Sequence, residues 1–203
     1  MRVSQYVLVA FLSVLPLART FAQADAFQIR YAAHLDIGDS VINISNSGSM
    51  GSGATTGNIC VNVYTYDPSE EMISCCACLV TPNALVSLSA RGDLVSNSFS
   101  PAVPTSIVIE LVASVPRLNH CDPATPTIAT LAPGLRAWGT TLHALSVIPP
   151  KYALTEDDFL WSTASAAELG HVTSFCSFIE KNGSGFGICK SCRFAGLGGD
   201  KQD

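Results

Sequence analysis

The sequence predicts a mostly β fold, an immunoglobulin-like β-sandwich with a short C-terminal helix and a disulfide-stapled tail. Three observations support this prediction. Apolar and polar residues alternate over several short segments, proline and glycine separate those segments, and eight cysteines follow a leader-like N-terminus. Alternation with period two is typical of strands that bury one face, and many such strands favour a sandwich. A partly open barrel is the alternative architecture.

Residues 1–24 are expected to be an export signal. Arg2 supplies a positive charge before an apolar run over 6–18, and residues 22–24 read Ala-Gln-Ala, a small-x-small cleavage pattern. The run is too short to span a bilayer, and Pro16 interrupts it. We therefore expect a protein secreted to an extracellular or periplasmic compartment.

The mature chain, residues 25–203, is expected to hold a β-sandwich domain over 25–150. A helical, cysteine-containing cap over 151–203 would pack on the same domain. The leader carries two of the 11 basic residues and none of the 16 acidic ones, which leaves a net charge of −7. Such an acidic chain without a basic cluster is a poor candidate for nucleic acid binding. We expect no transmembrane segment in the mature chain and no cofactor.

Alternating residues predict strands in several places along the chain. The clearest pair is a hairpin in which 59–66 and 72–80 flank the turn 67–70, which reads Asp-Pro-Ser-Glu. An even-length loop would place Cys60 opposite Ala77, and an odd-length loop would place it opposite Cys76 or Cys78. The other predicted strands are 27–34, 41–46, 107–112 and 135–147.

The last fifty residues change character. Residues 155–158, Thr-Glu-Asp-Asp, indicate a helix N-terminus, and residues 165–168 form a capping box. Apolar residues then recur at helical spacing, which predicts one amphipathic helix over 165–181.

The cysteines are expected to form four structural disulfides, because exported thiols meet an oxidising compartment. In a strand over 72–80, Cys76 and Cys78 share one face and Cys75 points to the other. We expect the C-terminal segment to be linked to this hairpin through at least one of its own cysteines. A zinc site and a redox-active pair are the alternatives. The disulfide candidates are Cys60, Cys75, Cys76, Cys78, Cys121, Cys176, Cys189 and Cys192.

No local motif indicates an active site, so no catalytic or metal-binding residue is assigned. A site assembled from distant residues such as His143, Asp157 and Glu168 is compatible with the sequence. An Arg-Gly-Asp tripeptide at 91–93 is more typical of a polar turn. Four aromatic residues are candidates for a ligand surface, although core packing is their default role: Trp138, Trp161, Tyr64 and Tyr66.

Three blocks of this chain resemble an uncharacterised family of secreted bacterial cysteine-rich proteins. They are Ile-Cys-Val-Asn-Val-Tyr at 59–64 with Cys-Cys-Ala-Cys at 75–78, Gly-Leu-Arg-Ala-Trp-Gly at 134–139, and Gly-Ser-Gly-Phe-Gly-Ile-Cys with Cys192 at 183–192. The likeness covers roughly residues 40–200. It implies bacterial export and carries no activity.

The sequence favours a secreted, non-catalytic structural or binding protein of unknown ligand, with a possible envelope or extracellular protein partner. A secreted hydrolase-type enzyme with a non-local active site is the first alternative. A subunit that self-assembles through edge strands is the second, suggested by the alternating segment 27–34.

Overall fold

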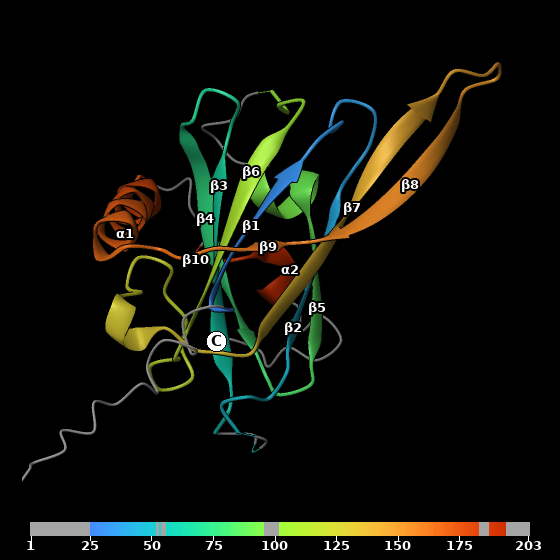
Figure 1. Ribbon diagram of the computed structural model, residues 1–203. Coiled ribbons are helices and arrows are strands. Elements are labelled where there is room, and N and C mark those ends of the chain that lie inside the picture. The colour runs from blue at the N-terminus through green and yellow to red at the C-terminus, as the bar shows by residue number, and fades with distance from the viewer. Residues whose placement is uncertain (1–24, 52, 54–55, 96–101, 183–186, 194–203) are drawn as a thin grey trace, which may run out of the picture.

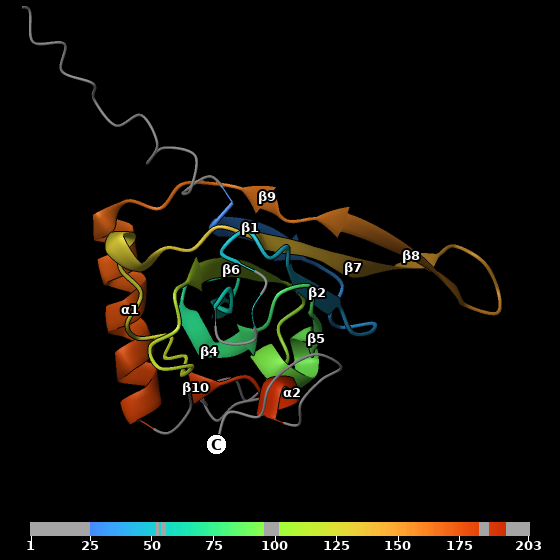
Figure 2. The ribbon, with the colours of Figure 1, turned by 90° about the horizontal axis from the view of Figure 1, so that it is seen from below.

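The computed structural model describes residues 25–51, 53, 56–95, 102–182 and 187–193. The expected export signal lies outside these residues. Two β-sheets face each other in the described chain, one helix covers the outer side of the larger sheet, and a long hairpin extends away from the body (Figures 1 and 2). The protein is therefore mostly β with a short C-terminal helix, as the alternation predicts.

The larger sheet has the strand order β10-β4-β3-β6-β1-β9 among the described residues. Its pairs are antiparallel except for β10, which runs parallel to β4. The predicted hairpin forms its centre, with Asp67 at the start of the connecting turn. The strands are β1 (Phe27–Ala32), β3 (Ile59–Tyr66), β4 (Met72–Val80), β6 (Ile107–Ser114), β9 (Leu160–Trp161) and β10 (Gly187–Ile188).

The smaller sheet has the strand order β5-β2-β7-β8 and is antiparallel throughout the described chain. β8 pairs along its whole length with β7, so the region after residue 150 begins as the second arm of a hairpin. The strands are β2 (Val41–Asn46), β5 (Leu85–Ser89), β7 (Leu135–Leu145) and β8 (Lys151–Asp158).

The main core lies between the two sheets. Alternate residues of each strand point inward, and β-branched and leucine side chains dominate these positions. Val61 and Ile109 of the larger sheet and Ile44 of the smaller one are fully buried in the same apolar cluster. Burial of this kind stabilises a fold by about 1.5–3 kcal/mol for each large aliphatic side chain.

Helix α1 (Ala166–Lys181) packs on the outer side of the larger sheet, as Figure 2 shows. Ser165 caps it by accepting a hydrogen bond from the Glu168 amide at 3.0 Å, which confirms the predicted N-terminus. The buried stripe of the helix meets Tyr64 and Cys75 of the sheet. This stripe consists of Leu169, Val172, Cys176 and Ile179.

Two predictions from the sequence are wrong, and strand β5 was not predicted. Residues 155–158 continue strand β8 instead of starting a helix, because eight backbone pairings with β7 outweigh a local preference for a cap. Strand β5 is an element that no alternation predicted. Cys60 lies opposite Leu79, because a bulge between Thr65 and Tyr66 shifts the hairpin register.

All eight cysteines lie in the described residues and form four disulfides. β4 carries three of the bonded cysteines, and the expected division of its faces is confirmed: Cys75 points toward α1, whereas Cys76 and Cys78 point into the main core. The Cys60–Cys121 disulfide ties the loop after β6 to β3. The pairs are Cys60–Cys121, Cys75–Cys176, Cys76–Cys189 and Cys78–Cys192.

Helix α2 (Lys190–Arg193) carries the last of these cysteines and packs against β4 and β5. Of the helices in the described part of the chain, none is long and apolar enough to cross a membrane.

We predict that the oxidised protein contains no titratable thiol. Formation of four disulfides removes eight hydrogens, so reduction should raise the intact mass by about 8 Da. Alkylation under denaturing conditions should label no cysteine before reduction and all eight after it. Free thiols together with one bound zinc ion per chain would contradict the disulfide assignment.

Candidate functional site

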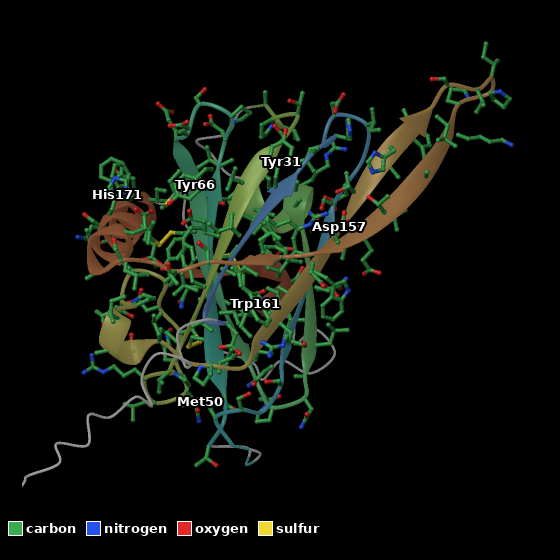
Figure 3. All side chains as sticks on the ribbon, viewed as in Figure 1. Tyr31, Met50, Tyr66, Asp157, Trp161 and His171 are labelled. Carbon is green, nitrogen blue, oxygen red and sulfur yellow. A yellow bond between two sulfur atoms is a disulfide. The ribbon has the colours of Figure 1, made fainter. Side chains whose placement is uncertain are left out.

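A hollow with a mainly apolar lining lies between α1 and the turn that joins β3 to β4. Its volume is about 510 Å³. Figure 3 shows Tyr66 and His171 on its two sides, one from the sheet and one from the helix. We call this feature the α1 groove. Its lining residues are Tyr66, Glu70, Glu71, Met72, Ile73, His171, Phe175, Phe178 and Ile179.

The helix side of the groove is aromatic and exposed. Phe175 and Phe178 lie beside the buried stripe of α1 rather than within it, and they are 48% and 62% exposed. The His171 ring meets the Phe175 ring edge to face, with centroids 4.6 Å apart. Two exposed phenylalanines on one helix are costly to hydrate, and such exposure in a hollow is typical of a binding surface.

The sheet side of the groove carries two acids from the turn between β3 and β4. The Asp67 carboxylate holds this turn by accepting hydrogen bonds from the Ser69 and Glu71 amides. Glu70 has a backbone φ of 64°, which lies in the left-handed region that favours glycine. A glutamate at such a position costs folding energy, so its presence at the groove is compatible with a functional role.

A partly buried carboxyl group, that of Glu110, lies close to Tyr66. Glu110 of β6 lies near the Tyr66 hydroxyl, and its Oε2 atom is buried without a hydrogen-bond partner in the described structure. Burial, followed by the nearby charge of Glu168, raises the pKa of Glu110 to about 7. Burial and the Glu110 charge also raise the pKa of Tyr66 well above its ordinary value.

The sequence-predicted trio of His143, Asp157 and Glu168 is not brought together. The His143 Nε2 atom lies 2.9 Å from the Thr155 hydroxyl, within the β7–β8 hairpin. Asp157 is in the same hairpin, where its charge acts on Arg30. Glu168 lies on α1, which covers the opposite sheet (Figure 3).

The four aromatic candidates lie in three different parts of the structure: a second hollow, the core and the α1 groove. Trp138 and Trp161 line a second hollow of about 420 Å³ beside the end of β8. Arg136 also lines that hollow, where it lies 5.3 Å from the centroid of the Trp161 ring and forms a 2.9 Å ion pair with Asp25. Tyr64 is fully buried, and only Tyr66 reaches the α1 groove.

The Arg-Gly-Asp segment has a structural role. Asp93 is only 3% exposed, and its carboxylate accepts hydrogen bonds from the Ser191 amide at 2.7 Å and the Ser191 hydroxyl at 2.8 Å. It therefore fixes the start of α2 and does not present a carboxylate to a receptor. The polar-turn interpretation agrees with this geometry.

Three sulfur atoms come together at the tail. The Sγ atoms of Cys78, Cys189 and Cys192 lie within 4.8 Å of one another. Each is already bonded in a disulfide, and a disulfide sulfur lacks the thiolate charge that zinc requires. This cluster therefore serves as a covalent staple in the oxidised chain.

Sequence reasoning missed Glu110, Phe175 and Phe178. Glu110 had a visible signal, since a single acid interrupts an otherwise apolar run over 107–113. The phenylalanines follow the helical period only loosely, and their exposure depends on where the sheet meets α1.

Comparison with protein-family models returns no match, and comparison with curated proteins returns none either. Among solved structures, the chain is similar to the crystal structure of Thermotoga maritima 1070, with a TM-score of 0.39 and 9% sequence identity. The similarity covers 68% of this chain and 97% of that chain. A likeness this distant carries no argument about function.

We predict that Glu110 makes stability depend on pH. Between its ordinary pKa of 4.5 and about 7, the folded chain binds more protons than the unfolded chain, so the free energy of unfolding should fall as pH rises. Glu110→Gln should make this slope shallower and stabilise the protein at pH 8 by on the order of 1 kcal/mol, since Glu110 is only partly buried. Urea unfolding at pH 4.5 and pH 8 measures both values.

Glu71→Gln, which removes an acid at the groove's sheet side, is the matched control. Equal pH dependence in wild type, Glu110→Gln and Glu71→Gln would contradict the assignment of the slope to Glu110.

Proposed function

We propose that this chain is an exported, non-catalytic binding module, and that the α1 groove receives an apolar segment carrying positive charge. The observation that supports this most directly is the pairing of exposed Phe175 and Phe178 with Glu70 and Glu71 around one hollow. An apolar floor supplies affinity, and the acids at its side select the charge of the ligand.

Charge favours a cationic ligand over an anionic one. The full 203-residue chain has a net charge of −5, and two acids flank the groove. The carboxyl groups of Glu180 and Asp122 add negative charge near the C-terminal part of α1, where burial, followed by the Asp122 charge, raises the pKa of Glu180. A peptide with alternating apolar and basic side chains combines the two properties that this surface complements.

The proposal includes the finer features of the sequence interpretation. Export and a bacterial envelope or extracellular setting are supported by the leader-like N-terminus and by four disulfides, which persist in oxidising compartments. We also propose the immunoglobulin-like type of sandwich, which is supported by two antiparallel sheets around one core.

We predict binding of a blocked pentapeptide in which lysine alternates with leucine and phenylalanine. Residues 25–203 contain two methionines, Met72 in the groove and Met50 at the far end of the molecule (Figure 3). In ¹³C-methyl spectra, the Met72 signal should shift with peptide concentration while the Met50 signal stays still. The glutamate version of the peptide should cause no shift.

Substitutions test the aromatic side and the acidic side of the groove separately. Phe178→Ala should weaken peptide binding by about tenfold, whereas Tyr31→Ala, which removes an aromatic side chain of matched exposure on β1, should have no effect. Glu70→Gly should weaken binding without loss of stability, because glycine suits the φ of this position. A shift at Met50, or equal affinity for both peptides, would contradict the proposal.

A hydrolase is the second candidate, and Glu110 is the specific observation in its favour. A carboxyl group with a pKa of about 7 beside a second carboxylate is typical of a general acid. If a substrate reaches this group past Tyr66, Glu110→Gln should lower the rate on a panel of nitrophenyl esters and glycosides by about a hundredfold. Equal rates for wild type and variant would exclude this function for those substrates.

A further inference from the structure

The β7–β8 hairpin extends from the body and ends in a strand with a free edge. β8 pairs with β7 on one side, and no described strand pairs with its other side. All of its residues are exposed except Ala153, which is half-buried. Figure 1 shows the outer part of the hairpin standing clear of α1 and of the larger sheet.

The free edge presents a regular row of backbone groups. The Phe159 amide donates to the Ala137 carbonyl, so residues 157, 155, 153 and 151 also direct their backbone groups toward β7 by the alternation of an antiparallel ladder. The N–H and C=O groups of Tyr152, Leu154, Glu156 and Asp158 therefore point outward, and an unpaired row of this kind is a template for another strand.

We propose that β8 pairs antiparallel with β8 of a second copy of this chain, with Leu154 on the two-fold axis. In this register Lys151 lies opposite Asp157 of the second copy and Tyr152 lies opposite its Glu156. Opposite charges face each other at both ends, and the leucine side chains meet at the centre. The outward backbone groups of Tyr152, Leu154 and Glu156 in both strands are then paired with one another.

Other registers and directions lack this match. A two-fold axis at Thr155 would set Leu154 opposite Glu156, and an axis at Glu156 would set two glutamates opposite each other. Parallel pairing would gather the acids of residues 156–158 from both copies. Charge complementarity along β8 thus selects one antiparallel arrangement, which joins the two smaller sheets into one continuous sheet.

Pairing of one short strand buries less surface than a permanent dimer, so we expect a reversible, concentration-dependent equilibrium. Sedimentation velocity on residues 25–203 from about 1 to 300 µM measures it. Leu154→Lys should weaken association by about tenfold or more, because lysines meet at the axis. Leu160→Lys, which changes an exposed leucine on β9, should leave association unchanged.

Charge reversal tests the register. Lys151→Glu and Asp157→Lys should each associate about tenfold more weakly alone, with folding checked by circular dichroism. An equimolar mixture of the two should form a heterodimer of wild-type affinity, because each reversed charge meets its complement. A wild-type chain that stays monomeric to about 300 µM, a Leu154→Lys variant that associates normally, or a mixture that fails to associate would each overturn the proposal.

Discussion

The arrangement of the C-terminal third depends on three cysteines of one strand. Successive residues of β4 point to opposite faces, so Cys75 reaches Cys176 of α1 on the outer side, while Cys76 and Cys78 reach the tail on the inner side. Closing loops of 101 to 114 residues removes conformational entropy from the unfolded chain, worth about 2–4 kcal/mol for each bond. The α1 groove exists because this bond network holds the helix against the β3–β4 hairpin.

A second constraint joins the two sheets through a buried cation. Arg30 of β1 is only 6% exposed and donates to the Gly139 carbonyl at 3.0 Å and the Thr141 hydroxyl at 2.8 Å, both in β7. A Cβ atom at residue 139 would lie 2.9 Å from the guanidinium, so glycine permits this approach. Burial lowers the pKa of Arg30, and the Asp157 charge opposes that effect. The root of the β7–β8 hairpin is therefore fixed, while its outer part extends freely.

The local sequence pattern was sufficient to predict an element where at least one of its faces is buried along its whole length. Strands β2 and β3 and the capped helix α1 follow from period and capping alone, because side-chain alternation and helix ends are local properties. β8 could not be predicted this way, since its Thr-Glu-Asp-Asp segment has little burial to create a period. The α1 groove could not be predicted from the sequence either, because Tyr66 and Phe178 come from segments more than a hundred residues apart.

The amino-acid sequence by itself determined that this is a β-rich chain with cysteines suited to disulfides, and it determined which faces of β4 those cysteines occupy. These properties depend on composition and on neighbours within a few residues. Only the tertiary structure decided which cysteines pair, which aromatic residues stay exposed and which strand edge is left unpaired. Those outcomes depend on distances between segments far apart in the chain, and such distances are set by packing of the whole molecule.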